Sequence, residues 1–280
     1  MPALSQLTLY PVKSCAGVSL REAVLTSAGL TSGGVADREW MVVDAAGNFL
    51  TQRECPLMAT IVPYLSPEIL TLRAPGMADL RPALSPIQGP AVAVQLWEET
   101  VPAIDCGNAA AAWFSAVLRV ACRLVRCPLH GRRIASTRWT DGILAPTRFA
   151  DGFPVLVIGQ ASLDDLNQKL QLQGRPRLPM NRFRPNIVID GIAPFEEDHA
   201  ASICIGDAVL KPVKPCPRCP IPSVDQDTGI VGLDPLDILQ SYRGNRLLDG
   251  AITFGMNAIV LSGDGTILRV GQECDITLAF

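Results

Sequence analysis

Residues 211–229 read KPVKPCPRCPIPSVDQDTG, the most informative stretch of the chain. Because proline fixes φ and lacks an N–H, this stretch is predicted to be neither a helix nor a central strand. The stiff loop presents two thiols, Cys216 and Cys219, with Lys214 and Arg218 beside them. Nearby cations favour the thiolate, which is the form that binds metals or attacks electrophiles. A loop of this composition is predicted to carry chemistry.

The C-x-x-C spacing of the two thiols leaves several kinds of site open. A structural zinc site needs two more ligands at matching spacing, and none of His199, Cys204 and Cys274 supplies a second pair. A thioredoxin-like redox pair opens a helix, which Pro220 and Pro222 disfavour. Two other interpretations remain. The pair is either two loop thiols without a role, or one of the thiols is a single-thiolate ligand for a metal or cofactor.

The composition is that of a compact globular protein. At 280 residues the chain can form one large domain or two smaller ones. Hydrophobic residues make up 48% and charged residues 18%, which excludes an intrinsically disordered chain. The net charge is -3 and no long basic tract occurs, so no nucleic acid partner is expected.

Neither an export signal nor a membrane span is expected. Residues 1–10 lack a basic region followed by a long apolar run. The longest apolar stretch, residues 109–122, is interrupted by Arg119 and is too short to cross a bilayer. Nine cysteines, an odd number, without an export signal indicate a reducing compartment, and the cytoplasm is the expected location.

Short strands bounded by turns dominate the pattern, which predicts a mixed α/β, β-rich architecture rather than a regular βαβ series. Residues 40–44 and 47–51 predict a hairpin, as do residues 258–261 and 267–270 around a Ser-Gly-Asp-Gly turn. The other expected strands are residues 4–10, 91–96, 154–158, 187–189 and 203–210. The expected helices are residues 109–122 capped by Asn108, one from Ser162 to near Gly174 with Leu163, Leu166 and Leu170 on one face, and residues 236–242 after Asp234-Pro235.

Three further segments hold residues suited to an anion. Residues 10–17, YPVKSCAG, place a lysine and a hydroxyl in a turn after the first strand. Arg38 precedes the next strand and offers a guanidinium fork. Four arginines lie between residues 175 and 184 without an acid, and such a cluster repels itself unless it meets an anion. Taken alone, an ordinary turn and a surface ion pair explain the first two better, and a solvated loop explains the third equally well.

Other catalytic patterns are weak. The chain has two histidines, His130 and His199, and neither belongs to a convincing Ser-His-Asp arrangement. There is no P-loop and no GxGxxG after a strand. Asp225 and Asp227 fit an acid–base pair, although Asp-x-Asp-Thr-Gly also fits a turn.

Taken in order, these segments resemble the MOSC family, named after the C-terminal domain of molybdenum cofactor sulfurase, and in particular its branch of amidoxime-reducing components and bacterial relatives. The resemblance covers nearly the whole chain. Its segments are YPVKS (10–14), DREW (37–40) with TQR (51–53), FRPNIV (183–188), CPRC (216–219), VDQDTG (224–229) and FG (254–255). No single segment is decisive, but the ordered set is specific.

The resemblance implies the fold and the division of the chain. It implies a MOSC β-barrel with a smaller N-terminal β-rich module and a few helices. The N-terminal domain is expected over residues 1–125 and the MOSC domain over residues 126–280. This division leaves open that the first strand joins the C-terminal barrel.

The resemblance also implies a molybdenum–molybdopterin cofactor, and no pyridoxal phosphate is expected. Cys219 matches the family's protein ligand to molybdenum and is thereby a predicted catalytic residue, while Cys216 has no assigned role. As a separate hypothesis, Asp225 or Asp227 relays protons or orients a metal-bound oxygen, and Asp225 is the one assigned to the catalytic site. The predicted cofactor-binding residues are Lys13, Ser14, Arg38 and Arg184, with Arg182 as a weaker candidate. Asn257 stands where relatives can have a tyrosine, which puts a phenol contact in doubt.

The implied activity is that of a molybdenum-dependent oxidoreductase that removes oxygen from small N-hydroxylated compounds, such as an amidoxime or a hydroxylated nucleobase. No iron–sulfur spacing occurs, so electrons are expected from a separate ferredoxin, flavodoxin or cytochrome b5-like protein with its reductase. Two alternatives stay open. One is a protein that binds or carries the cofactor without turnover, and the other is a sulfur carrier with a persulfide on Cys219 or Cys216.

Overall fold

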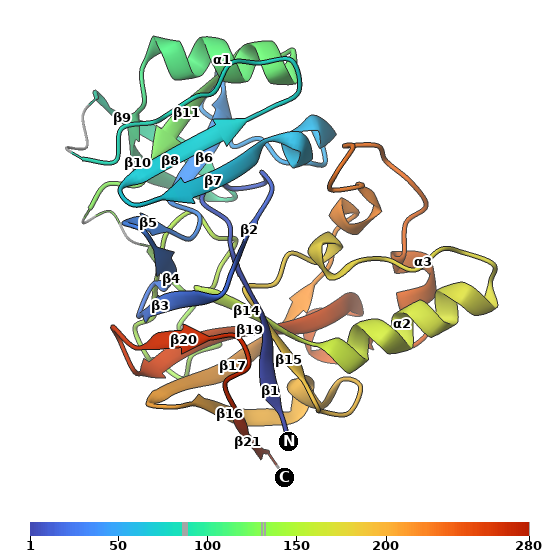
Figure 1. Cartoon of the computed structure of the whole chain (residues 1–280). Coiled ribbons are helices and arrows are strands. Elements are labelled where there is room, and N and C mark those ends of the chain that lie inside the picture. Colours follow the sequence, from blue (N-terminus) through green and yellow to red (C-terminus); the bar gives the residue numbers. More distant parts are fainter. Residues whose placement is uncertain (86–88, 130, 132, 280) are drawn as a thin grey trace.

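One large, mostly antiparallel sheet forms the base of the molecule (Figure 1). The computed structural model describes residues 1–85, 89–129, 131 and 133–279, so His130 lies outside the described residues. In spatial order the strands of this sheet are β2 (Val18–Leu20), β1 (Ala3–Leu9), β15 (Ile187–Asp190), β14 (Val155–Gly159), β19 (Ala251–Ser262), β17 (Ala208–Pro217), β16 (Ala200–Ile205) and β21 (Asp275–Leu278), with β18 (Gly244–Asn245) beside β19.

The parallel pair β14–β15 lies inside this sheet and is joined by helix α2 (Gln160–Leu172). Both strands are almost wholly buried, as expected of parallel strands covered on both faces. Helix α2 buries Leu163, Leu166 and Leu170 against one face of the sheet, which confirms the predicted apolar stripe. The short helix α3 (Leu236–Leu239) packs beside α2.

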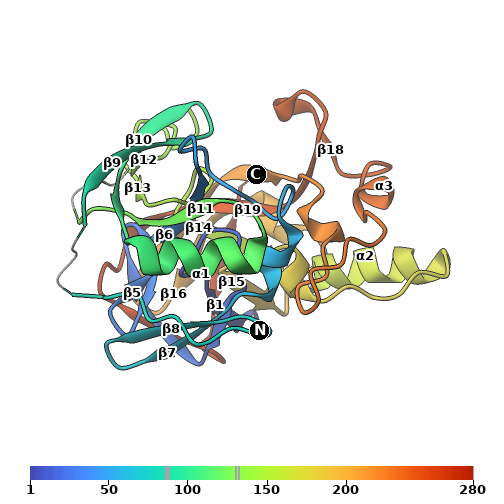
Figure 2. The ribbon, with the colours of Figure 1, turned by 90° about the horizontal axis from the view of Figure 1, so that it is seen from above.

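A second sheet builds the N-terminal module, at the top of Figure 1. Helix α1 (Asn108–Leu118) lies across this sheet and packs against β11 (Figure 2). Its buried Trp113 and Phe114 join the main hydrophobic core. The strands in spatial order are β6 (Trp40–Asp44), β11 (Cys122–Arg126), β10 (Glu99–Asp105) and β9 (Ala91–Leu96).

A third sheet lies between these two and corrects one prediction. Residues 258–261 and 267–270 do not form a hairpin, because β20 pairs with β3 rather than with β19. Gly263 and Gly265 adopt positive φ and turn the chain away, and a Cβ on Gly263 would lie 2.5 Å from Ala208. The strands of the third sheet are β20 (Ile267–Arg269), β3 (Glu22–Thr26), β4 (Gly29–Ser32) and β5 (Val35–Ala36). Two further two-stranded sheets pair β7 (Val62–Ser66) with β8 (Ile69–Arg73) and β12 (Arg133–Ile134) with β13 (Pro146–Thr147).

The proline-rich stretch is a strand up to Pro217, so the predicted loop begins later than expected. Strand β16 pairs with β17 only over residues 208–210, and the proline-containing half of β17 has β19 as its ladder partner. Register shifts occur around these prolines, which fits a strand half with one hydrogen-bonded neighbour and bulges. The single strand expected at residues 203–210 is instead a hairpin with Gly206 in its turn.

The helix boundaries differ from the predicted ones for local reasons. Gly107 rather than Asn108 is the N-cap of α1, and the helix ends early because Arg119 adopts φ 58°. Ser162 lies inside α2, which begins at Gln160. Pro235 rather than Asp234 is the N-cap of α3, although Asp234 still accepts a hydrogen bond from the Leu236 N–H, and the helix ends at Leu239 rather than at residue 242.

The β-rich fold class is confirmed. Within the described ranges, no helix is both long and apolar enough to cross a membrane. Among the described residues, the free thiols include Cys204, Cys216 and Cys219.

Candidate active site

One cavity, of about 1020 Å³, lies between the N-terminal module and the large sheet. It is lined by residues from the turn after β1, the β9–β10 turn, residues 150–153, residues 182–186 and the end of β17 with its following loop. Predicted site residues that line it are Lys13, Ser14, Arg38, Arg182, Arg184 and Cys219. Cys216 and Asn257 line it too, whereas Asp225 is not among the lining residues.

The cavity is strongly cationic although the chain is slightly acidic. Eight lysine and arginine side chains line it, against four aspartates and glutamates. The whole chain carries a net charge of -3. A concave site lined by one sign of charge concentrates the opposite sign, so the cavity favours an anionic ligand.

Arg38 and Arg184 lie on the same buried tyrosine. Their guanidinium carbons are 4.3 Å and 4.4 Å from the centre of the Tyr10 ring. Arg38 donates to Asp37 at 2.5 Å and to Asn186 at 3.1 Å, and its other terminal nitrogen contacts the Arg184 carbonyl at 3.4 Å. These contacts fix two like charges side by side at the cavity wall.

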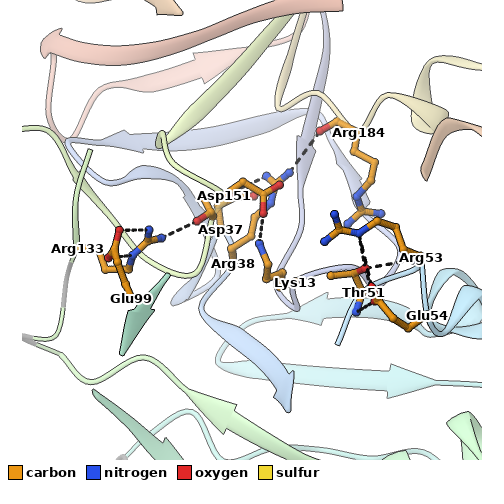
Figure 3. A network of polar contacts seen from close by, with 11 residues as sticks. Lys13, Asp37, Arg38, Thr51, Arg53, Glu54, Glu99, Arg133, Asp151 and Arg184 are labelled. Carbon is orange, nitrogen blue, oxygen red and sulfur yellow. Dashed lines mark hydrogen bonds and ion pairs between the residues drawn. The ribbon is translucent and has the colours of Figure 1, made fainter. Parts of the chain in front are cut away.

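Lys13 forms an ion pair with Asp151, as Figure 3 shows. Burial lowers the pKa of Lys13, and the Asp151 carboxylate opposes this shift. Burial raises the pKa of Asp151. The charge of Lys13 and its hydrogen bond lower this pKa by more, so it lies below its usual value. Water still reaches the carboxylate, because the Asp151 side chain is 75% exposed within the open cavity. Asp151 therefore stays deprotonated near neutral pH.

Three predicted cofactor-binding residues share an unusual backbone. Ser14, Arg38 and Arg184 adopt φ of 66°, 47° and 57°. Left-handed backbone costs energy in residues other than glycine and persists where the surroundings hold it, often at functional sites. The sequence gives no sign of this shared conformation.

The loop that carries Cys219 is anchored by Arg218. Its guanidinium donates to the Phe254 carbonyl at 2.9 Å and 2.7 Å and to the Phe183 carbonyl at 2.8 Å. Arg218 thus fixes the backbone next to Cys219, which is half-buried at the cavity. Arg218 lowers the pKa of the Cys216 thiol as expected, but burial raises it by more, so the net shift does not favour a thiolate at Cys216.

Asp225 lies behind Arg182 rather than at the cavity wall. Its carboxylate accepts from Arg182 at 2.6 Å and from the Thr228 hydroxyl at 2.8 Å. The Thr228 contacts come first among the causes that lower the pKa of Asp225. The same turn holds Asp227, whose N–H donates to Asp225. Asp225 therefore positions Arg182, and its predicted part in proton relay stays a prediction.

The protein supplies no metal cage of its own in the part of the chain that the structure describes. There, no three His, Cys, Asp or Glu side chains come together to hold an ion. The zinc alternative lacks its ligand set among these residues. A metal at Cys219 would need most of its ligands from a cofactor.

Family models match both parts of the chain. A model of the MOSC N-terminal beta barrel domain matches residues 1–121, and a model of the MOSC domain matches residues 145–275. A mouse (Mus musculus) protein, mitochondrial amidoxime-reducing component 1, is 37% identical over 279 residues, covering 96% of this chain and 80% of its own length. The chain belongs to the MOSC family.

Two further relatives of this MOSC protein come from rat and rice. Mitochondrial amidoxime reducing component 2 of Rattus norvegicus is 38% identical over 250 residues, covering 86% of the chain and 72% of its own length. Molybdenum cofactor sulfurase of Oryza sativa subsp. japonica is 30% identical over 306 residues, covering 96% of the chain and 35% of its own length. The family and these relatives associate the chain with the molybdenum cofactor.

Sequence reasoning missed several cavity residues of this MOSC protein. Asp151 comes from a polar, turn-like stretch without a recognisable motif. Arg133 contacts Glu99 at 2.8 Å and the Ala150 carbonyl at 2.8 Å, and so holds the backbone next to Asp151 (Figure 3). Trp97 lines the rim from the β9–β10 turn, where only its position in a hairpin turn could have drawn attention.

Proposed function

We propose that this MOSC protein reduces N-hydroxylated compounds with a molybdenum–molybdopterin cofactor, to which Cys219 contributes a thiolate ligand. The observation that carries the proposal is one cavity that unites Cys219 with eight cationic side chains. Thiolate sulfur is a soft ligand suited to a sulfur-coordinated transition metal. Lysine and arginine clusters bind phosphate, with arginine able to do so through two hydrogen bonds.

The cavity residues fit such a cofactor. The buried Nε of Arg182 has no hydrogen-bond partner among the described residues. Arg184 contacts the Cys15 carbonyl and the Gln226 amide, and Lys214 lies 5.2 Å from the centre of the Trp139 ring. Neither of these two cations has an ion pair with a carboxylate within the described ranges. Their positive charge is available to an anionic ligand.

Each predicted residue then has a definite part in holding the cofactor. Lys13, Arg38 and Arg184 would bind its phosphate and pterin, with the Ser14 hydroxyl as a further partner. Asp225 would act through Arg182, which it orients. The deprotonated Asp151 would accept a hydrogen bond from the cofactor or substrate while it keeps Lys13 in place. When bound, the cofactor supplies the two-electron chemistry that removes the N-hydroxyl oxygen.

The overall reaction consumes electrons, so the protein needs an electron-donor partner. Replacing N–OH by N–H consumes two electrons and two protons and releases water. We propose a separate ferredoxin, flavodoxin or cytochrome b5-like donor for the electrons, because the relatives are named as components of an amidoxime-reducing system. The odd number of nine cysteines favours a reducing compartment such as the cytoplasm.

Metal and pterin content give the first test. We expect the purified protein to contain molybdenum in a near-stoichiometric amount and to release a fluorescent pterin on denaturation. Zinc in place of molybdenum would contradict the proposal. Molybdenum without reduction under any donor would instead indicate a cofactor carrier, and cyanide-releasable sulfur without molybdenum would indicate a sulfur carrier.

The substitution Cys219→Ser gives the second test. We expect it to abolish reduction of an N-hydroxy compound by a reduced dye, because a serine oxygen replaces the soft sulfur ligand. Cys204→Ser is the matched control, since Cys204 is a half-buried thiol on β16 that does not line the cavity. Equal activity of the native protein and the Cys219 variant would refute the assignment of the ligand.

A further inference from the structure

Trp97 is held in place at the rim of the cavity. It is 43% exposed and lines the cavity from the turn between β9 and β10. Its φ of 56° is a left-handed conformation that is rare for a large side chain. Gln95 supports this conformation, because its side chain donates to the Trp97 carbonyl at 2.9 Å. An exposed aromatic ring on a strained, supported turn indicates a functional position.

Trp97 is part of a continuous row of rings and cations. Its ring centre lies 4.9 Å from that of Phe49 at an interplanar angle of 60°. The Arg53 guanidinium lies 4.8 Å from the centre of the Trp97 ring, and the Lys13 ammonium lies 5.4 Å from the centre of the Phe49 ring. We call Phe49, Trp97 and Arg53 the aromatic shelf. The shelf leads from the predicted cofactor residue Lys13 out to the solvent.

The Lys13 end and the Trp97 end of this row lie at different depths, so they are suited to different ligands. Lys13 and Ser14 are 5% and 7% exposed, so a group that they bind lies deep in the cavity. The exposed ring of Trp97 faces ligands that arrive from solvent. A cavity of about 1020 Å³ lies at the upper end of the usual range for ligand pockets, roughly 300–1,000 Å³, and so has room for two occupants.

The charges around the shelf are balanced. Arg53 lies 3.8 Å from a carboxylate oxygen of Glu54, and Arg133 contacts Glu99 at 2.8 Å. The shelf therefore does not select its ligand by net charge, unlike the deeper part of the cavity. Flat rings stack on aromatic faces irrespective of charge, and an arginine over the ring strengthens such a platform.

We propose that the aromatic shelf is a substrate subsite that stacks the planar ring of aromatic and heteroaromatic N-hydroxylated compounds and selects them over aliphatic ones. This inference rests on the proposed function and adds the class of substrate to it. Trp97 contacts the ring of the substrate rather than its reacting oxygen. Its removal therefore affects substrate binding more than the chemical step.

The test compares Trp97→Ala and Trp97→Phe on an aryl and an alkyl substrate with the same reacting group, benzamidoxime and acetamidoxime. We expect Trp97→Ala to raise KM for benzamidoxime about tenfold, with kcat nearly unchanged, because a stacking surface is lost. The KM for acetamidoxime should change by less than about twofold, and Trp97→Phe should keep most of the preference.

Tyr64→Ala is the matched control. Tyr64 is 45% exposed and has the Arg73 guanidinium 4.4 Å from its ring centre, but it does not line the cavity. We expect this variant to behave as the native protein. An equal change in KM for both substrates in Trp97→Ala, or no change, overturns the proposal. Loss of molybdenum from Trp97→Ala also overturns it, because the shelf would then belong to the cofactor site.

A binding measurement separates this inference from the proposed function. Benzamidoxime should quench the tryptophan fluorescence of the native protein more than that of Trp97→Phe, whether or not turnover occurs. If a molybdenum-loaded protein reduces neither substrate, the proposed reaction is refuted. The quenching measurement still shows whether the aromatic shelf binds an aromatic ring. Equal quenching of the two proteins refutes the shelf.

Discussion

The ring of Tyr10 holds two positive charges side by side at the wall of the cavity. It is 2% exposed and contacts the guanidinium groups of both Arg38 and Arg184. Burial raises the pKa of Tyr10 although both arginines oppose the shift, so the hydroxyl stays protonated. The Tyr10 N–H also donates to Asp37 at 2.9 Å, which in turn holds Arg38. One aromatic side chain thus sets the positions of two predicted cofactor contacts.

The substitutions Tyr10→Phe and Tyr10→Leu separate the ring from the hydroxyl. We expect Tyr10→Phe to keep native stability within about 1 kcal/mol, because the face of the ring remains. We expect Tyr10→Leu to lower the free energy of unfolding by about 2–3 kcal/mol and to reduce molybdenum content several-fold, since both cation–π contacts are lost. Chemical denaturation and metal analysis are the measurements, and equal molybdenum content in the two variants would contradict this role.

Sequence reasoning reaches some residues of the site and not others. Lys13, Arg38 and Arg184 stand in recognisable segments, so their grouping at one cavity could be expected. Asp151 and Trp97 stand in turns without a motif, and only the folded backbone brings them to the same cavity. A turn residue has no periodic pattern that reveals the direction of its side chain.

At the scale of elements, the prolines of β17 and the N-terminus of α2 depart from what local sequence preferences predict. Strand β17 tolerates three prolines because β19 is its ladder partner in that half. The start of α2 is satisfied by a distant carboxylate rather than by Ser162. Glu197 accepts from the Gly159 N–H at 3.0 Å and from the Ser162 hydroxyl at 2.8 Å, although it is fully buried. Tertiary contacts of this kind cannot be inferred from local sequence.

Glu197 predicts a pH dependence of stability. Burial raises its pKa above the ordinary 4.5, and the hydrogen bonds from Gly159 and Ser162 only partly oppose this shift, while Asp198 adds to it. Between pH 4.5 and the raised pKa the folded state binds more protons at this site than the unfolded state. The contribution of Glu197 to stability is therefore fully present below pH 4.5 and is lost as the pH rises through the raised pKa.

The substitution Glu197→Gln should remove this dependence. We expect the free energy of unfolding of Glu197→Gln, relative to the native protein, to increase with pH above 4.5 and then level off, with a slope of at most about 1.4 kcal/mol per pH unit. Urea denaturation between pH 4 and pH 8 measures the difference. Glu196→Gln, at a half-buried neighbouring position, is the control, and parallel curves for all three proteins would refute the assignment.

At the scale of the whole molecule, the chain closes on itself in a way that no local pattern predicts. Strand β1 pairs with β15 across more than half of the sequence, and β20 pairs with β3 near the other end of the chain. Some strands could be predicted from apolar alternation and turn residues, such as β1, β9 and β14, whereas others, such as β3, β10 and β11, were missed. Their partners could not, because pairing depends on which apolar faces meet in the folded core. The cavity is a product of that pairing.

Gln52 and Gln226 connect the two parts of the molecule behind the cavity. Each amide donates to the other, at 3.0 Å and 2.9 Å, and both side chains are buried. Gln52 also donates to the Ser14 carbonyl at 2.7 Å, and Gln226 accepts from Arg184 at 3.3 Å. This amide pair links residues 174 positions apart and supports two predicted cofactor contacts.

A double-mutant cycle tests this connection. We expect Gln52→Leu and Gln226→Leu each to lower the free energy of unfolding by about 2 kcal/mol, because each leaves a buried amide without its partner. The double variant should lose at least about 1 kcal/mol less than the sum of the two, since no amide is then left unpaired. Molybdenum content should be lower than in the native protein in all three variants, because each loses the contact to Ser14, to Arg184 or to both. Additive destabilisation with native molybdenum content would show that the amide pair neither joins the two parts nor supports the site.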